Sequence, residues 1–520
     1  MSLRSVVKYT AIASVVTSAI VGGGCVIGPK YKKPSTVLPP SYKEIGSPAD
    51  AGEWKAAQPG DAATRGPWWL AFDDPLLNDL EARLNVTNQT IAAAVANVQI
   101  ARALVKQARA QYFPTVAVNP SVTNARIATG FGESVGRTFT AYVLPFEAAW
   151  EPDFWGRIRN TVAASRLALQ VSAADLENVR LSAQADLAAH YWALRTQDAL
   201  IQVTVAAAGA YQETLDITRV RYTAGLESDE AVALAETQLN ATRAEATNLG
   251  ILRAQYEHAI AVLVGEPAST FSIAVDSTSR LTPPAVPVGV PSELLERRPD
   301  IAAAERAVAE ANARIGIAQT AFFPLTLLSA SAGFEGLSLL KWLAWPNRIW
   351  SVGPSLAQSI FDAGLRKATV QQYRAAYDQT VATYRQTVLT AFQEVEDNLA
   401  AIRIATQVLD EQRAAVQSAQ RGLEIADVRY RSGVDPYLNV LVAQTALLNT
   451  QQAAVTYQGQ QLAASVQLIK ALGGGWNVSL LSSVAERRPR CNAQDDAILL
   501  KALDIVGTTS RLSSEGASRT

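Results

Sequence analysis

The chain contains Arg221-Tyr222-Thr223-Ala224-Gly225 and, 208 positions later, Arg429-Tyr430-Arg431-Ser432-Gly433. Two further pairs repeat at nearly the same offset: Gln111-Tyr112-Phe113-Pro114 with Ala321-Phe322-Phe323-Pro324, and Gly156 with Gly364. Similarity at a fixed period indicates repeated copies of one structural element. The sequence therefore predicts a pseudo-symmetric molecule with an internal duplication.

Each copy contains two long helical segments that meet at the repeated glycine. No proline occurs from Gly156 to about Tyr222, and apolar residues recur there with helical spacing. About 65 residues at ~1.5 Å each would form a rod of roughly 100 Å. Gly225 would end this helix, and a second helix would return from about Ser228 to Val264. Such a hairpin cannot bury its apolar stripe alone, so we expect it to pack on copies of itself.

The remaining helices follow from the same patterns. Asp73-Asp74-Pro75 carries the acidic and proline residues typical of a helix start, and this helix would run to about Phe113. In the second copy we expect helices over 292–321, 366–430 and 437–472.

Two stretches, 115–150 and 325–361, alternate in hydropathy as β-hairpins do. In the first hairpin Tyr142, Leu144, Phe146 and Trp150 fall on one face, which would suit contact with lipid. A hairpin in a soluble sandwich would show the same alternation, so the pattern alone leaves both alternatives open.

The N-terminus resembles a bacterial export signal with a lipid-attachment cysteine. Arg4 and Lys8 precede a short apolar run, and Gly22-Gly23-Gly24 leads directly to Cys25. We expect Cys25 to be acylated, with an ordinary cleaved signal peptide as the alternative. Val26 in place of Asp after the cysteine favours outer-membrane sorting, by resemblance to bacterial lipoproteins. Beyond Cys25 the chain has no apolar run of 18 or more residues.

No catalytic or cofactor site is predicted. The two histidines, His190 and His258, lie singly within long helical segments, where packing or surface roles are the common ones. The glycine runs at 22–24 and 473–475 lack the pattern of a phosphate-binding loop. The net charge of −1 carries no basic excess, so nucleic acid is not an expected partner. We expect no enzyme activity and no cofactor apart from the lipid on Cys25.

One segment, Pro291-Ser292-Glu293-Leu294-Leu295-Glu296-Arg297-Arg298-Pro299-Asp300-Ile301, closely resembles the signature of the TolC-like outer-membrane efflux factors. Ala311-Asn312-Ala313-Arg314-Ile315-Gly316, Tyr430-Arg431-Ser432-Gly433-Val434 and Leu472-Gly473-Gly474-Gly475-Trp476 support the resemblance. Together with Cys25 they point to the NodT/OprM-type lipoprotein branch, over roughly residues 25–476.

The resemblance implies an α+β membrane protein. Each protomer would supply four strands to a trimeric 12-stranded β-barrel, and the helices would continue it as a long coiled-coil barrel in the periplasm. The implied organisation is: signal peptide 1–24, lipid-anchored linker 25–72, first repeat 73–266, connector 267–291, second repeat 292–473, and a largely disordered tail 474–520.

The resemblance also implies the outer-membrane channel of a tripartite efflux system, localised to the bacterial outer membrane. Its partners would be two further copies, outer-membrane lipid, a periplasmic membrane fusion (adaptor) protein and an inner-membrane transporter of the resistance-nodulation-division type. Alternatives are an exit duct for type I protein secretion or metal-cation efflux and, from another class, a non-conducting periplasmic coiled-coil scaffold.

The hairpin tips are the candidate functional site. By resemblance, Gly225, Leu226, Gly433 and Val434 would contact the adaptor, and Tyr430 matches a tyrosine that latches the closed mouth. The usual acidic positions fall instead on Ala231, Asn439 and Val442. We therefore expect a substitute set of charged gate residues near the tips: Arg221, Asp229, Glu230, Arg429, Arg431 and Asp435.

Overall fold

The computed structural model describes residues 26–36, 39, 41–44, 67–126, 138–276, 281–284 and 297–475. Cys25, the predicted signal peptide, residues 45–66 of the linker and residues 476–520 of the tail lie outside this part. The chain divides into two compact units. The sheet unit is Met1–Ser35, Asn97–Ser172 and Ala303–Arg385, and the helix unit is Thr36–Ala96, Ala173–Ala302 and Gln386–Thr520.

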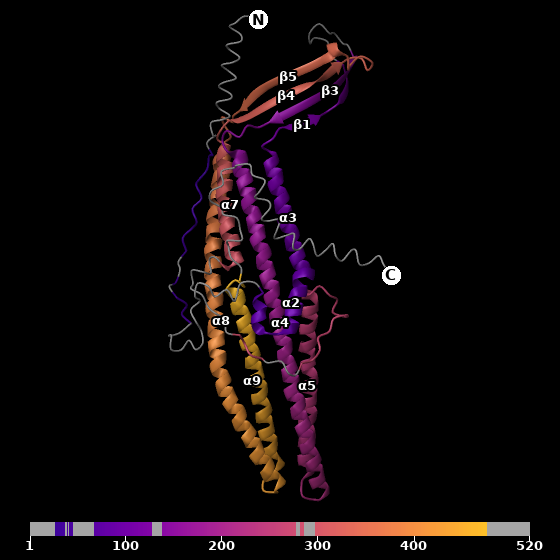
Figure 1. Cartoon of the computed structure of the whole chain (residues 1–520), viewed down its shortest axis with the longest axis vertical. Helices are drawn as coiled ribbons and strands as arrows, with labels where there is room; N and C mark the ends of the chain where they lie inside the picture. Colours follow the sequence, from indigo (N-terminus) through magenta and orange to yellow (C-terminus); the bar gives the residue numbers. More distant parts are fainter. Residues whose placement is uncertain are drawn as a thin grey trace. The chain divides into compact units, whose positions relative to one another are not determined.

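The helical elements follow the duplication. They are η2 (Trp68–Phe72), α2 (Pro75–Thr87), α3 (Gln89–Ala110), α4 (Arg157–Thr223), α5 (Asp229–Leu263), α7 (Pro299–Thr320), η4 (Trp345–Asn347), α8 (Leu365–Arg431) and α9 (Tyr437–Ala471). α4 and α8 each have 67 residues, and α5 and α9 each have 35. α4 turns directly into α5 and α8 into α9 (Figure 1). The prediction of two matching helical hairpins is confirmed.

The single helix expected from Asp73 to about Phe113 is wrong, because it breaks at Asn88 into α2 and α3. Asn88 has an extended backbone, and its side-chain oxygen accepts from the Ile91 N–H at 2.9 Å. Its side-chain amide donates to the Leu263 carbonyl at 2.8 Å. An asparagine whose side chain accepts from the Ile91 N–H in the first turn of α3 acts as an N-cap, which favours a helix start over a continuous helix.

The strands are β1 (Thr115–Val118), β2 (Ser121–Arg126), β3 (Thr138–Trp150), β4 (Leu325–Gly336) and β5 (Arg348–Ala357). All pairings are antiparallel in the order β1-β3-β4-β5, and β2 also pairs with β3. β1 and β2 form one strand interrupted at residues 119–120, where proline cannot donate to the ladder. Both predicted hairpins are confirmed, and pairing of β3 with β4 joins them into one sheet.

The register separates the two faces of the sheet. Directly paired residues share a face, so one face carries Val116, Val118, Val122, Tyr142, Leu144, Phe146, Ala148, Trp150, Leu328, Ala330, Ala332, Phe334, Trp350, Val352, Pro354 and Leu356, with Asn124, Thr140, Thr326 and Arg348 among its polar members. The opposite face is mixed: it carries the small and polar residues Thr115, Ser121, Thr123, Glu147, Ser329, Ser331, Glu335, Ser351 and Ser355, together with the apolar Phe139, Val143, Leu327 and Ile349. We call them the apolar face and the polar face. The apolar face extends the predicted set of Tyr142, Leu144, Phe146 and Trp150 across four strands.

Aromatic side chains gather where the helices of the sheet unit meet the strands. The Trp155 ring stacks on Phe323 at 5.0 Å, and its indole N–H donates to the Pro324 carbonyl at 2.9 Å. The Trp150 indole donates to the Tyr112 carbonyl at 3.0 Å. Aromatic rings at one level are typical of a boundary between apolar and aqueous surroundings. Within the described residues, no helix combines the length and hydropathy of a bilayer-crossing segment.

The first described residues of the linker have no regular secondary structure, and they pack against the rest of the sheet unit. The Ile27 N–H donates to the Trp155 carbonyl at 3.2 Å, and Asn160 donates to the Ile27 carbonyl at 2.7 Å. Farther along, Asn312 of α7 donates to the Pro29 carbonyl at 2.8 Å. Gly316 permits the close approach, since a Cβ there would lie 3.0 Å from the Ile27 carbonyl oxygen. We call residues 26–36 the strap.

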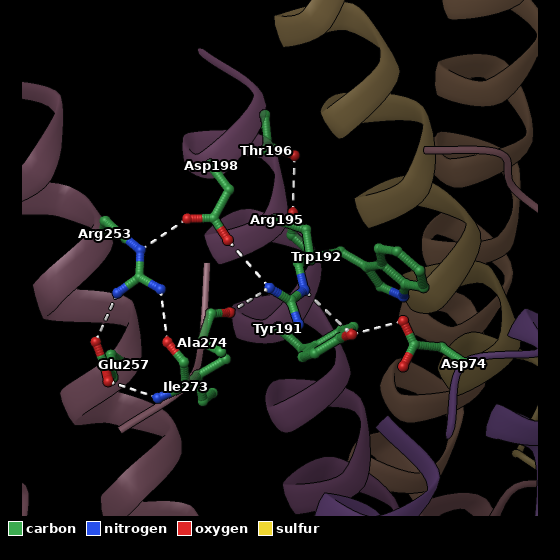
Figure 2. Close-up of polar contacts among 10 residues, drawn as sticks. All are labelled: Asp74, Tyr191, Trp192, Arg195, Thr196, Asp198, Arg253, Glu257, Ile273 and Ala274. Carbon is green, nitrogen blue, oxygen red and sulfur yellow. Dashed lines mark hydrogen bonds and ion pairs between the residues drawn. The ribbon is translucent and has the colours of Figure 1, made fainter. Parts of the chain in front are cut away.

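A chain of polar contacts crosses the helix unit (Figure 2). Asp198 of α4 accepts from Arg195 at 3.1 Å and from Arg253 of α5 at 2.7 Å, with its side chain fully buried. Arg253 also pairs with Glu257, which accepts from the Ile273 N–H at 2.7 Å. Because each buried charge has a partner, loss of one partner would leave another uncompensated, at a cost of ~3–5 kcal/mol.

The same chain of contacts reaches the start of α2. Arg195 donates to the Tyr191 hydroxyl at 3.2 Å, and that hydroxyl donates to Asp74 at 2.5 Å. Asp74 is also the N-cap of α2, where it accepts from the Leu76 and Leu77 N–H groups. Burial, together with the hydrogen bond to Asp74, raises the pKa of Tyr191. The network thus fixes α2, α4, α5 and the segment after α5 to one another.

Candidate functional site

The two hairpin tips end their first helix in the same way. At the first tip the Leu226 N–H donates to the Arg221 carbonyl at 2.8 Å, and the Gly225 N–H to the Tyr222 carbonyl at 2.9 Å. At the second tip the Val434 and Gly433 N–H groups make the equivalent bonds, to Arg429 and Tyr430. This pattern is the Schellman motif, which needs a residue with positive φ. Gly225 and Gly433 supply it, at φ 71° and 77°.

The tips differ in how the return helix begins. At the first tip Ser228 caps α5 by accepting from the Ala231 N–H at 3.2 Å. At the second tip the equivalent N-cap of α9 is Pro436, which makes no side-chain cap bond. Leu226 and Val434 are exposed at the two ends, at 68% and 64%. Both tips therefore present an apolar side chain on a fixed turn.

Tyr430 lies inside the helix unit, between the two hairpins. It is 1% exposed, and its hydroxyl is hydrogen-bonded to the Thr218 hydroxyl of α4 at 2.9 Å. Its ring meets Tyr437 of α9 edge-on at 5.8 Å. Burial raises the pKa of both tyrosines, that of Tyr437 to about 12. Both are therefore neutral throughout the physiological range.

Arg221 of the first hairpin completes this contact with the second. Its guanidinium carbon lies 4.9 Å from the centre of the Tyr430 ring, and Nη1 donates to the Arg431 carbonyl at 3.3 Å. The stack is a cation–π interaction, in which the ring face attracts the charge. We call Arg221, Tyr430 and Thr218 the inter-hairpin latch.

Arg429 and Asp435 form an ion pair within the second hairpin. The Arg429 Nε and Nη2 atoms donate to the two carboxylate oxygens of Asp435 at 2.6 and 3.0 Å. The hydrogen bond from Arg429 lowers the pKa of Asp435 below its usual value. Arg431 pairs separately with Asp427, at 2.8 Å. These bidentate and i,i+4 pairs stiffen the end of α8 and do not cross to the first hairpin.

The other predicted gate residues take no part in the latch. Asp229 and Glu230 are exposed in the first turn of α5, where acidic groups favour a helix N-terminus. Asn439 and Val442 are exposed on α9. Ala231, at the remaining acidic position, is 6% exposed and packs in the core of the tips. Asn439, Val442 and Ala231, which stand at the usual acidic positions of the family, therefore supply no carboxylate.

A polar seam that was not predicted from the sequence joins α4 and α9. Gln444 donates to Thr214 at 2.9 Å, and the Tyr211 hydroxyl donates to the Gln444 carbonyl at 3.0 Å. Gln452 donates to Thr204 at 3.0 Å. The signal was available, because Thr204, Tyr211 and Thr218 recur every seven residues on one stripe of α4.

The seam and the latch hold the two hairpins together by reversible, non-covalent contacts. Around them lies an apolar cluster of Tyr211, Leu215, Ala235, Leu239, Tyr437, Val440 and Leu448. In the described residues no group of three or more His, Cys, Asp or Glu side chains is placed to hold a metal ion. The site therefore offers a mechanical link between hairpins, built from one stack and a few hydrogen bonds.

This chain is similar in sequence to a known protein family and to several characterised proteins. The chain matches the outer membrane efflux protein family over residues 82–266 and 290–474, one match for each copy. It is 32% identical over 476 residues to the toluene efflux pump outer membrane protein TtgC of Pseudomonas putida, covering 90% of this chain and 96% of TtgC. It is 32% identical over 450 residues to the pyoverdine export outer membrane protein OpmQ of Pseudomonas aeruginosa, covering 83% and 93%.

A solved structure shows the same fold. The outer-membrane channel OprN superposes with a TM-score of 0.78 at 29% identity, covering 87% of this chain and all of OprN. The family match, the relatives and the shared fold all point to one family. The chain belongs to the outer membrane efflux protein family, and it is an outer-membrane component of an efflux system.

Proposed function

We propose that three copies of this chain form a passive exit duct through the outer membrane and the periplasm, and that the hairpin tips gate it. The duct performs no chemistry. Energy comes from an inner-membrane transporter of the resistance-nodulation-division type, coupled through an adaptor protein. The observation that carries the proposal is the sheet, which has one apolar and one polar face.

The sheet supports closure by further copies. Among the described residues, β5 and β1 with β2 are the edge strands of the sheet, and their outer backbone N–H and C=O groups have no strand partner there. In hydrocarbon such groups must be paired, which a closed barrel achieves. Four strands from each of three copies make a twelve-stranded barrel with the apolar face toward lipid and the polar face toward the lumen.

The strap supports a lipid anchor at Cys25. The N–H of Ile27, two residues later, donates a hydrogen bond to the Trp155 carbonyl, and the Trp155 ring stacks on Phe323, just before β4. A lipid on Cys25 would therefore be attached two residues before a position held against Trp155. An acylated N-terminus adds to the hold of the barrel on the membrane.

The tips support an adaptor contact and a gate. Leu226 and Val434 are exposed apolar side chains on rigid turns, which suits packing against helical hairpins of a partner. The inter-hairpin latch holds the second hairpin against the first, so its release would allow the second hairpin to move. Three protomers with two hairpins each would offer six similar docking positions, matching the near six-fold surface that the duplication implies.

The transported compounds are proposed from the relatives. TtgC is named for toluene and OpmQ for pyoverdine, so related ducts serve chemically different cargo. We infer that this duct passes small toxic organic compounds and that the inner-membrane pump selects them. Deletion of the gene should raise sensitivity to solvents and drugs. Loss of polypeptide secretion alone, or sensitivity to metal cations alone, would favour the alternative ducts.

Thiol labelling tests the duct through the two faces of the sheet. In a Cys491→Ser background, Ser351→Cys places a thiol on the polar face and Val352→Cys places one on the apolar face of the same strand. A charged, water-soluble thiol reagent should reduce single-channel current for Ser351→Cys and leave Val352→Cys unchanged. A block of the Val352→Cys protein alone would reverse the faces. A trimer that never conducts would favour the scaffold.

A further inference from the structure

The loop between β4 and β5 carries an unusual concentration of exposed apolar side chains. Residues 337–347, which we call the β4–β5 loop, read Leu-Ser-Leu-Leu-Lys-Trp-Leu-Ala-Trp-Pro-Asn. Leu337, Leu339, Leu340, Leu343 and Trp345 are all exposed, with Leu340 at 95% and Trp345 at 71%. Contiguous exposed apolar surface marks an interaction site more often than chance.

The loop is held in one shape by its own backbone. The Lys341 N–H donates to the Ser338 carbonyl at 3.2 Å, and the Ala344 N–H donates to the Lys341 carbonyl at 3.0 Å. The Asn347 side chain donates to the same Lys341 carbonyl at 2.7 Å. The leucines are therefore displayed by an ordered turn, at a small further entropy cost on binding.

The loop leans on the apolar face of the sheet. The Trp342 ring meets the Tyr142 ring edge-on at 5.9 Å, and Tyr142 lies on the apolar face. Gly336, paired with Tyr142, allows this approach, because a Cβ there would lie 2.9 Å from the Trp342 Cα. The apolar surface of the loop is thus continuous with the proposed lipid-facing surface.

The loop lies at the end of the sheet away from the helices. α7 leads into the start of β4 at Leu325, and β5 ends at Ala357 before α8, so both connections to helices are at the other end. On the proposed function, the helices are periplasmic and this end faces the outer leaflet. The inference below rests on that orientation.

The loop and the first residue of β5 carry charges of one sign. Lys341 of the loop and Arg348 of β5 are the charged residues of 337–348, and the nearest acidic residue of β4, Glu335, lies on the polar face. Both cations are exposed, and Arg348 is held over the Trp345 ring at 4.8 Å, where it also donates to the Trp345 carbonyl at 3.0 Å. Guanidinium and ammonium groups beside apolar side chains suit a lipid with a phosphorylated head.

We propose that the β4–β5 loop binds a phosphorylated glycolipid of the lipopolysaccharide type in the outer leaflet. The acyl chains pack on Leu339, Leu340 and Leu343, and the phosphates pair with Lys341 and Arg348. A second copy of the loop is a poorer occupant, because like charges would face one another. A plug over the lumen is also disfavoured, because Trp342 packs on the lipid-facing side.

The test titrates the full-length protein in nanodiscs with purified lipopolysaccharide and with lipid A stripped of its phosphates. Bound lipid is counted by native mass spectrometry, which also verifies the oligomer. Lipopolysaccharide should bind the unaltered protein at least tenfold more tightly than the stripped lipid. Lys341→Glu with Arg348→Glu should remove that preference, and Leu339→Ser with Leu340→Ser should weaken both lipids. Lys32→Glu, an exposed cation of the strap, is the matched control and should change neither.

Three results would overturn the inference. Equal binding by the double-charge variant and the control would remove the cations from the site. Disulfide formation between Leu340→Cys loops of neighbouring copies would make the surface a self-contact. If Leu339→Ser with Leu340→Ser changed the single-channel conductance and left lipid binding unchanged, the loop would act as a plug of the lumen. A protein that binds the glycolipid yet never conducts would refute the duct and leave the lipid site standing.

Discussion

The repeated Arg-Tyr pair makes different contacts in the two copies. Tyr222 and Tyr430 are equivalent in the duplication, yet Tyr222 is 45% exposed and Tyr430 is 1% exposed. Arg221 crosses to the second hairpin and stacks on Tyr430, whereas its counterpart Arg429 pairs with Asp435 inside its own hairpin. The repeated sequence therefore produces an asymmetric contact: Arg221 of the first hairpin contacts the second hairpin, whereas Arg429 of the second hairpin stays within its own.

The largest contrast is expected between Tyr430→Ala and Tyr222→Ala. Tyr430→Ala removes a buried aromatic ring and should destabilise the tip region by ~3–5 kcal/mol. Tyr222→Ala changes an exposed side chain and should stay within ~0.5 kcal/mol. Amide hydrogen exchange of residues 425–445 measures the difference. Equal protection in the two variants would mean that the copies are equivalent at this position.

Arg221→Ala and Arg429→Ala should differ next most. Loss of Arg221 removes the cation–π stack, worth about 1 kcal/mol, and the bond to the Arg431 carbonyl. It should loosen contact between hairpins, seen as faster exchange in both tips. Loss of Arg429 breaks an exposed pair and should affect the second tip alone. Faster exchange at the first tip in Arg429→Ala would show that Arg429 also crosses between hairpins.

The glycines should show no contrast between the copies. Gly225→Ala and Gly433→Ala each force alanine into a left-handed conformation, which should cost about 1 kcal/mol at either tip. Thermal unfolding of the two variants checks this equality. A Cβ on Gly433 would meet only the Arg221 Nη2 atom, at 3.8 Å, so the site is open. A much larger loss of stability in Gly433→Ala than in Gly225→Ala would contradict this.

Acid should act on the second tip only, and weakly. Because the folded pKa of Asp435 is lowered by Arg429, the pair contributes above the ordinary aspartate pKa and is lost as pH falls through the lower folded value. Tip exchange corrected for its intrinsic pH dependence should therefore be constant from pH 8 to pH 5 and rise only below pH ~4. Asp435→Asn should remove that acid-dependent step. A step near pH 6 would assign the titration to another group.

The sequence predicts the repeated architecture well because long helices and hairpins leave periodic patterns. Lengths, tip glycines and the apolar face of β3 all follow from spacing. The break at Asn88 was missed because its capping bonds, one of them to the Leu263 carbonyl, do not alter the helical pattern. Two residues of the latch could be named from the sequence, since Tyr430 matched a family position and Arg221 was among the charged candidates. Thr218 and the pairing of the three could not be named, because they are set by how α4 and α8 pack.

Single-channel recording of unaltered protein and Tyr430→Ala in planar bilayers tests the central claim most directly. If the chain is a duct held closed by the inter-hairpin latch, both proteins should produce discrete current steps. The variant should then conduct more or stay open longer. Current steps of equal size and duration in the two proteins would contradict the latch. The absence of steps in both would contradict the duct.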